Sequence, residues 1–160
     1  MHASPPDDAL RGAVAAYSGS LVRLAYTYLG NVPDSEDAVQ EAFLAYLRKA
    51  PAFADAAHEK AWLIRVTANK CKDALRRRKA FSTVLLTEDV ADAPASDREL
   101  LEAVLGLPEK YRLPLHLHYY EGYSLSEIAR IMNARPATVG SWLSRGRDLL
   151  RERTGGLFDA

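Results

Sequence analysis

The stretch SLSEIARIMNARPATVGSWL, residues 124–143, constrains the fold of this chain more than any other. Ser124 and Glu127 stand three residues apart, as in a capping box, where a serine hydroxyl and a glutamate carboxylate satisfy free amides at a helix start. Asn133 tolerates the left-handed backbone that a tight turn between helices needs. Pro136 is favourable at the first position of a second helix. The stretch therefore predicts a helix-turn-helix.

Apolar residues follow the helical period on one side of each of these two helices. The predicted buried seams are Leu125, Ile128, Ala129 and Met132 in the first helix, and Val139, Leu143, Gly146 and Leu150 in the second. At about 100° per residue, the opposite side of the second helix faces away from its seam. The candidates there for groove and phosphate contacts with DNA are Arg135, Thr138, Ser141 and Arg145. A helical hairpin that serves only as an interaction surface is the alternative.

Two residues are unusual in a helix that contacts DNA. Gly140 lowers helix stability by about 1 kcal/mol relative to alanine, so we expect it to permit close approach to DNA or to a neighbouring helix. Trp142 lies next to Leu149 on the flank of the helix. For this tryptophan, a half-buried structural role is favoured over contact with a base.

Helical periodicity continues through the first half of the chain and predicts three helices. The first is expected to be interrupted at residues 18–20 and to end at residues 30–33. Asp34 or Ser35 is expected to cap the second, whose acidic first turn suits the positive end of the helix dipole and which Pro51 ends. The first and third predicted helices span residues 7–29 and about 58–79.

Residues 81–97 are small and acidic and lack a sustained period apart from the brief STVLLT, which is typical of a flexible linker. A short helix is expected over residues 98–105. A longer helix is expected to open at Pro108, to kink at Pro114 because proline lacks an amide hydrogen, and to end at Gly122. The chain is thus predicted to be all-α, with two small helical domains. The predicted boundaries are 8–80 for the first domain, 81–97 for the linker and 98–155 for the second domain.

Charge is balanced overall, with 21 basic and 21 acidic residues, but it is unevenly distributed. Between Lys60 and Lys79 the chain carries many cations and the single acid Asp73. A local field of this kind attracts nucleic acid more than the net charge indicates, although many charge runs are only solvated helix faces. No apolar run is long enough to span a bilayer, and the first ten residues lack the order of a secretory signal, so we expect a soluble cytoplasmic protein.

Catalytic, cofactor and metal sites are not indicated by the sequence. Cys71 is the single cysteine, which excludes an intrachain disulfide. His116 and His118 are two residues apart on a helix, so their side chains diverge by roughly 200° and do not suit one metal ion. No glycine-rich phosphate loop or nucleophile-base pattern is present. We therefore expect no enzymatic activity.

Two blocks of the sequence together resemble one known family. DSEDAVQEAFLAYLRKAPAF with HEKAWLIRVTANKCKDALRRRKA resembles region 2 of bacterial RNA polymerase sigma factors, and LPEKYRLPLHLHYYEGYSLSEIARIMNARPATVGSWLSRGRDLLRE resembles region 4. The two regions joined by a short linker resemble the extracytoplasmic-function (ECF) group, over about residues 8–154. The resemblance implies a protein that binds core RNA polymerase and directs promoter recognition and opening.

The same resemblance implies partners and residue roles. Core polymerase would be contacted at the clamp helices of its largest catalytic subunit and at its flap, promoter DNA would be bound, and an anti-sigma factor would control the protein. The implied polymerase-binding residues are Asp37, Gln40, Glu41, Leu44 and Leu47. The implied residues for melting and reading the minus-ten element are Arg65, Asn69, Lys70, Lys72, Arg76 and Arg77. The second helix of the helix-turn-helix would hold the minus-thirty-five element as duplex.

The chain departs from the family pattern in that helix. Family members commonly carry a basic residue where Gly140 stands and another where Trp142 stands, which puts minus-thirty-five affinity in question. Two alternatives to a sigma factor remain at this point. One is a helix-turn-helix repressor that acts without polymerase, and the other is a polymerase-binding adaptor that has lost promoter reading.

Overall fold

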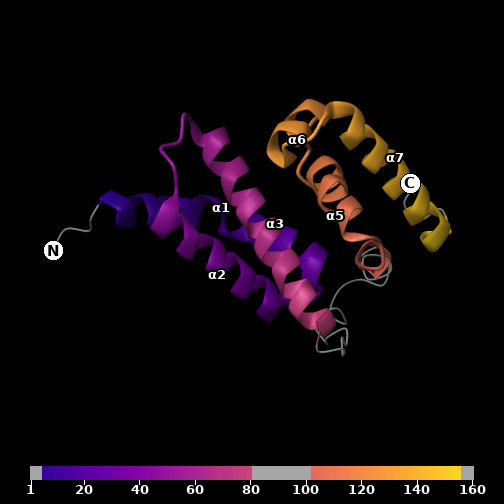
Figure 1. Ribbon diagram of the computed structural model, residues 1–160, viewed down its shortest axis with the longest axis horizontal. Helices are drawn as coiled ribbons and strands as arrows, with labels where there is room; N and C mark the ends of the chain where they lie inside the picture. Colours follow the sequence, from indigo (N-terminus) through magenta and orange to yellow (C-terminus); the bar gives the residue numbers. More distant parts are fainter. Residues whose placement is uncertain (1–4, 81–101, 156–160) are drawn as a thin grey trace.

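The computed structural model describes residues 5–80 and 102–155 (Figure 1). All regular elements of these residues are helical, which confirms the all-α prediction. The predicted linker lies outside the described residues, so its flexibility and the domain boundaries stay predictions. The helices are α1 (Pro5–Leu29), α2 (Val32–Lys49), α3 (Ala56–Ala80), a helical turn over residues 102–105, α5 (Glu109–Leu115), the π-helical segment η2 (His116–Tyr120), α6 (Leu125–Met132) and α7 (Pro136–Thr154).

The first helix is continuous, so the expected interruption at residues 18–20 is wrong. Leu21, Leu24 and Ala25 of α1 are fully buried against α2 and α3, together with Leu63. Burying apolar side chains contributes about 1.5–3 kcal/mol for each large one. The free energy gained by this burial outweighs the roughly 1 kcal/mol that the glycine within residues 18–20 costs inside the helix.

The start of α2 also differs from the expectation. Asn31, not Asp34 or Ser35, is the N-cap, and its side-chain oxygen accepts a hydrogen bond from the Asp34 amide at 2.8 Å. Pro33 lies in the first turn rather than breaking the chain there. An amide at that position has no partner within the helix, so a proline is tolerated. Ser35 is buried, and its hydroxyl donates to the Asn31 carbonyl at 2.6 Å.

Pro114 changes the type of helix in the second domain. Pro108 is the N-cap of α5, Pro114 lies inside α5, and the chain passes at His116 into the π-helical segment η2. The Glu121 amide there donates to the His116 carbonyl five residues earlier, at 3.1 Å. A proline has no amide to donate to the carbonyl four residues earlier, and here the wider helical turn begins two residues after it. The expected disturbance therefore takes the form of a π-helical segment.

The helix-turn-helix agrees closely with its prediction. Ser124 and Glu127 form both hydrogen bonds of a capping box, and Asn133 has the left-handed backbone with φ of 53°. Pro136 begins α7, and all four predicted seam residues of α7 are buried. In α6 the seam differs from its prediction, because Leu125 is 37% exposed, Met132 is half-buried and Ile131 is buried instead. Leu125 is the first residue of α6 and lies beside a glycine, so little side chain covers it.

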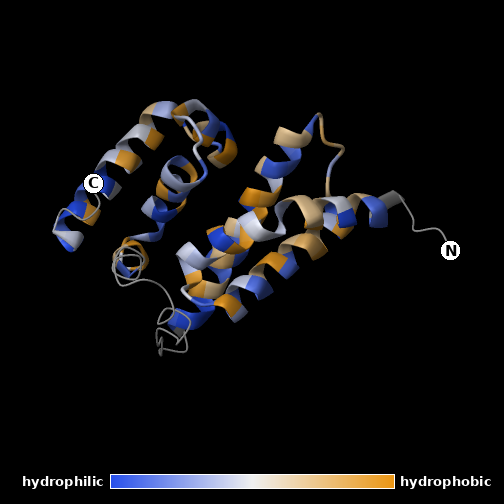
Figure 2. Ribbon diagram, turned by 180° about the vertical axis from the view of Figure 1, so that it is seen from behind, coloured by the Kyte–Doolittle hydropathy of each residue, from blue (hydrophilic) through white to orange (hydrophobic). Residues whose placement is uncertain are grey.

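The two domains lie side by side, with α5 against α1 and α6 against α3 (Figure 1). Hydrophobic and hydrophilic residues alternate along the helices rather than forming long apolar blocks (Figure 2). None of the helices in the described ranges is long and apolar enough to cross a membrane.

Candidate nucleic-acid interface and docking surfaces

The outer face of α2 carries the five predicted polymerase-binding residues. Its inner face is buried, with Val39, Phe43 and Tyr46 in the core. The predicted residues all lie on the exposed side and are Asp37, Gln40, Glu41, Leu44 and Leu47. Leu44 and Leu47 are 45% and 44% exposed, respectively. The outer face thus offers polar acceptors followed by an apolar patch, which suits contact with another protein.

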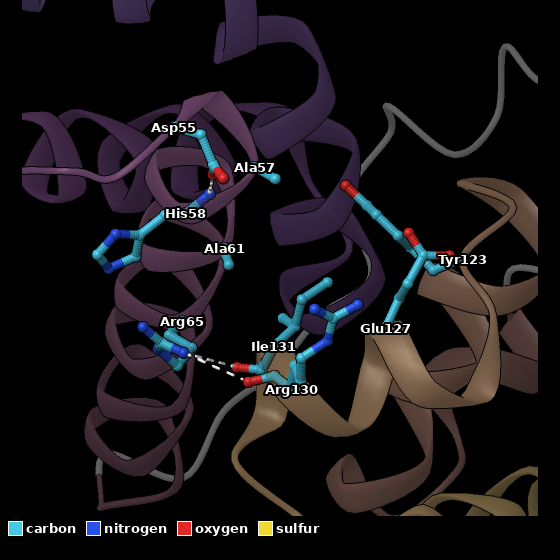
Figure 3. Close-up of a pocket in the computed structure, with 9 residues that line it drawn as sticks. All are labelled: Asp55, Ala57, His58, Ala61, Arg65, Tyr123, Glu127, Arg130 and Ile131. Carbon is cyan, nitrogen blue, oxygen red and sulfur yellow. Dashed lines mark hydrogen bonds between the residues drawn. The ribbon is translucent and has the colours of Figure 1, made fainter.

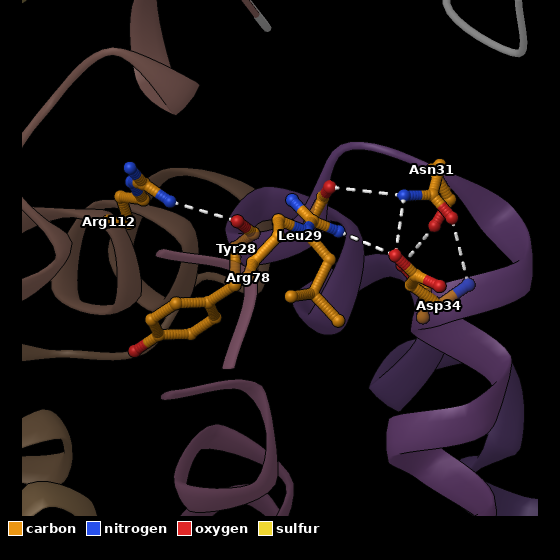
Figure 4. A network of polar contacts seen from close by, with 7 residues as sticks. Tyr28, Leu29, Asn31, Asp34, Arg78 and Arg112 are labelled. Carbon is orange, nitrogen blue, oxygen red and sulfur yellow. Dashed lines mark hydrogen bonds and ion pairs between the residues drawn. The ribbon is translucent and has the colours of Figure 1, made fainter. Parts of the chain in front are cut away.

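A polar network joins the start of α2 to the end of α3 (Figure 4). Asp34 Oδ2 accepts hydrogen bonds from Asn31 Nδ2 at 3.0 Å and from Arg78 Nη2 at 2.6 Å. The hydrogen bond from Asn31 and the contact with Arg78 together lower the pKa of the Asp34 carboxyl, although partial burial opposes them. Arg78 is therefore occupied in holding α3 against α2.

The predicted minus-ten residues fall on two different sides of α3. At about 100° per residue, four of them lie within roughly 60° of one another, and the other two are centred roughly 120° away. The first four, called the outer stripe below, are Arg65, Asn69, Lys72 and Arg76. Lys70 and Arg77 line a hollow between α2 and α3 with acceptors of the predicted docking face. The structure thus divides residues that the sequence treated as one set.

Arg65 of the outer stripe contacts the other domain. Its Nη1 donates to the Ile131 carbonyl at 3.3 Å and lies 3.5 Å from the Arg130 carbonyl (Figure 3). These carbonyls belong to the last turn of α6, where a cation is stabilised by the negative end of the helix dipole. A cavity of about 330 Å³ next to this contact lies between α3 and α6. In this arrangement the Arg65 guanidinium is engaged within the protein.

The outer side of α7 is open, as predicted. Arg135, Ser141 and Arg145 are exposed, and Thr138 is half-buried at the edge of the same side. Trp142 is half-buried and packs against the core, as Leu149 does. A flank position for Trp142 agrees with the structural role that the sequence favoured.

Close packing of α7 depends on Gly146 and not on Gly140. A Cβ added at Gly146 would lie 2.9 Å from Leu115 Cδ1 and 3.2 Å from Tyr111 Cβ. At Gly140 it would meet only Leu125 Cδ2, at an ordinary 3.6 Å. The expectation that Gly140 admits a neighbouring helix is therefore wrong. An approach to DNA remains the one functional reason for this glycine that the sequence proposed.

The residues that the structure describes form no metal site, and their cysteine is buried. No group of three or more metal-ligating side chains is assembled in those parts. Cys71 is fully buried, and burial raises the pKa of its thiol to about 12, so it packs as an apolar residue. His118 Nδ1 contacts the Tyr123 carbonyl at 2.8 Å, while the ring of His116 is stacked on Tyr120.

Sequence reasoning missed the polar residues that join the two domains. Arg112 donates to the carbonyls of Tyr28, Leu105 and Leu107. Glu121 accepts from Ser20, which is 101 residues away. An arginine within the apolar run YRLPL was a visible signal for the first contact. No local pattern marks Glu121, because its partners come from distant helices.

Comparisons with known proteins show to which family the chain belongs. Residues 13–81 match the family model for sigma-70 region 2, and residues 97–150 match the model for sigma-70 region 4. The chain is 30% identical to the ECF RNA polymerase sigma factor SigW of Bacillus subtilis, over 91% of this chain and 89% of that protein. It is 34% identical to the ECF sigma factor SigM of Mycobacterium tuberculosis, over 84% of this chain and 71% of SigM.

Solved structures show the same fold. The sigma factor RpoE of Bartonella quintana, in complex with the anti-sigma factor NepR, matches with a TM-score of 0.73 at 22% identity, over 89% of this chain and 94% of RpoE. CnrH in complex with the cytosolic domain of CnrY matches with a TM-score of 0.59 at 22% identity, over 91% and 87% of the two chains. With both regions matched in order, and with a relative 30% identical over most of both chains, the chain belongs to the ECF sigma factors of bacterial RNA polymerase.

Proposed function

We propose that this sigma factor docks on core RNA polymerase through the outer face of α2 and contacts promoter DNA through two other helices. The outer stripe of α3 serves the minus-ten element, and the outer side of α7 serves the minus-thirty-five element. The clamp helices of the largest polymerase subunit are the proposed partner of α2, and the flap is the proposed partner of the second domain. The protein acts in the cytoplasm and has no catalytic role of its own.

The pair of exposed leucines on α2 carries the docking proposal. Leu44 and Leu47 expose nearly half of their side chains on a helix whose inner face is fully packed. An apolar patch next to Gln40 and Glu41 matches the helix-helix mode of recognition, in which apolar anchors give affinity and polar neighbours give orientation.

Linkage of the two domains explains how a protein without net charge binds DNA. Each domain offers few cations to phosphates, so each binds promoter DNA weakly by itself. Once polymerase holds both domains, the second contact becomes intramolecular and its effective concentration rises. Promoter affinity then depends on polymerase.

An anti-sigma factor is the proposed regulatory partner. The similar RpoE structure contains the anti-sigma factor NepR, and the similar CnrH structure contains the cytosolic domain of CnrY. A protein of this kind would inhibit by covering the exposed outer face of α2 or the outer side of α7.

Replacement of Gln40 and Glu41 by alanine tests the docking surface. We expect the double variant to bind core polymerase at least about tenfold more weakly, because interface acceptors next to an apolar patch contribute orientation and affinity. Affinity is measured by fluorescence anisotropy with labelled sigma factor and purified core enzyme. Lys49→Ala, an exposed polar substitution at the end of the same helix, is the control and should leave the affinity unchanged. Equal affinities for all three proteins would refute the docking surface.

Transcription with purified core polymerase separates the proposal from its two alternatives. A sigma factor starts transcripts from its promoter, and it binds that DNA tightly only together with core enzyme. A repressor would shift its operator in a mobility assay without core enzyme. An adaptor would compete for core enzyme and start no transcripts.

A further inference from the structure

Glu121 lies between the two domains and contacts α1 and α3 of the first domain. Its Oε1 accepts a hydrogen bond from Ser20 Oγ of α1 at 2.7 Å, and its Oε2 lies 3.7 Å from Lys60 Nζ of α3. The side chain is only 12% exposed. From its own domain, His116 Nε2 lies 3.5 Å from Oε1. A carboxylate at the end of η2 is thus enclosed by groups from three separate elements.

Other cross-domain contacts flank Glu121. Arg112 Nη1 donates to the Tyr28 carbonyl at 2.9 Å, at the far end of α1. The Arg23 guanidinium lies 5.6 Å from the centre of the Tyr120 ring, within the range of a cation–π contact. Arg65 contacts the last turn of α6, as described above. The domains therefore meet at specific polar contacts spread along α1 and α3.

This closed arrangement conflicts with binding both promoter elements at once. The minus-ten and minus-thirty-five elements lie about 25 base pairs apart, which is roughly 85 Å at about 3.4 Å per base pair. Two domains of this size have radii of gyration of about 11 Å each. Domains in direct contact cannot reach over that distance, so promoter binding requires them to separate.

We propose that Glu121, with Ser20 and Lys60, forms an intramolecular latch that holds the two domains in a closed state unable to open a promoter. The inhibitory part of this proposal rests on the proposed function, because Arg65 is a proposed minus-ten contact. In the closed state Gln40 and Glu41 of α2 and Ser141 and Arg145 of α7 remain exposed. Docking and minus-thirty-five contact are therefore available before the latch opens, whereas Arg65 becomes available only afterwards.

Charge reversal of the Lys60–Glu121 pair tests the latch. Lys60→Glu or Glu121→Lys converts an attraction into a repulsion, and the double variant restores opposite charges in swapped positions. We expect each single variant to raise the ratio of open to closed molecules about tenfold, and the double variant to return toward wild type. Small-angle X-ray scattering measures the result, because a compact chain of this length has a radius of gyration of about 15 Å and separated domains exceed about 20 Å.

Two further variants separate opening of the latch from a general effect of charge on the radius of gyration. Glu152→Lys makes the same charge change at an exposed position of α7 and should leave the radius of gyration at the wild-type value. Ser20→Ala removes the hydrogen bond to Glu121 without adding charge and should expand the molecule less than Lys60→Glu does. Circular dichroism should show the same helicity for all variants, and expansion with unchanged helicity supports the latch.

Each outcome tests either the existence of the latch or its inhibitory role. Single variants as compact as the wild type, or a double variant as expanded as Lys60→Glu, would overturn the latch. Expanded variants that open promoters no faster than the wild type with core polymerase would overturn its inhibitory role. A wild-type protein that starts no transcripts with core polymerase would refute the proposed function, while the scattering result would still decide whether the latch exists.

Discussion

Helices α3 and α7 carry the two proposed DNA surfaces, and they differ in which part of the molecule holds their cations. On α3, Arg65 contacts the carbonyls of α6, Arg76 pairs with Asp73, and Arg78 pairs with Asp34. On α7, Arg145 faces outward on the open side of the helix, whereas Arg147 and Arg151 have partners within their own domain. The number of cations in a segment is therefore a poor measure of how many can contact phosphates. Arg65 of α3 is held by a contact with the other domain, whereas the paired arginines of α7 are held within their own domain.

The largest expected effect concerns the packing that holds α7 in place. Gly146→Ala should lower the free energy of unfolding of the second domain by about 1–3 kcal/mol, because the new methyl group overlaps Leu115 and Tyr111. Thermal unfolding followed by circular dichroism measures this change. The outer side of α7 presents its residues to DNA only if this packing is intact, so duplex binding should fall with it.

Gly140→Ala is the matched control, since it makes the same chemical change on the same helix. It should raise the free energy of unfolding by about 0.5–1 kcal/mol, because alanine favours the helix and the site has room. Equal effects of the two substitutions would contradict the assignment of close packing to Gly146.

A second pair of variants examines the two sides of α3. Arg76→Ala should slow promoter opening about fivefold, because it removes a phosphate contact from the outer stripe. Arg77→Ala removes the same charge from the hollow beside α2 and should slow opening less than about twofold. Permanganate footprinting of unpaired thymines measures opening with core polymerase. If both variants open the promoter equally slowly, net charge rather than the outer stripe determines the rate.

On α7 the expected effect is smaller and appears in the salt dependence. Arg145→Ala should reduce duplex affinity of the holoenzyme about threefold and lower the slope of log affinity against log salt by about 1, as expected for one lost phosphate contact. Gly140→Arg should change both quantities in the opposite direction, since it supplies the basic residue common in the family. Anisotropy titrations at several salt concentrations measure both. An unchanged slope for Arg145→Ala would remove this residue from the interface.

The smallest expected effect is a pH dependence of stability that arises from His116 in the second domain. Burial lowers the pKa of His116 below its ordinary value of 6.5, the nearby Glu121 opposes this, and Arg23 adds to it. Between the lowered pKa and 6.5, the unfolded chain binds more protons at this position than the folded one, so stability falls as the pH drops through that window. His116→Gln should flatten the fall. Melting curves across that window measure it, and a wild-type curve without slope there would contradict the prediction.

Local sequence determined the helix-turn-helix and the approximate positions of the helices, but not the cap of α2 or the continuity of α1. The partners of Ser124, Asn133 and Pro136 lie within a few residues of each, so short-range geometry is sufficient to predict them. On α2, the residues that the family resemblance named, among them Gln40 and Glu41, all lie on the exposed side of the helix. Family resemblance then added the roles, which no local pattern contains.

Other features were decided only by the tertiary structure. Spacing marked Gly146 for the buried seam, but only the packing of α5 on α7 showed that this glycine, and not Gly140, is the one the helix contact requires. The contacts of Arg65 and Glu121 join residues 66 and 101 positions apart. Such pairs leave no periodic trace in a single sequence, because each partner satisfies only local constraints until the chain folds. The sequence by itself thus determined which helices this sigma factor has, and the packing of its two domains decided which charges remain free.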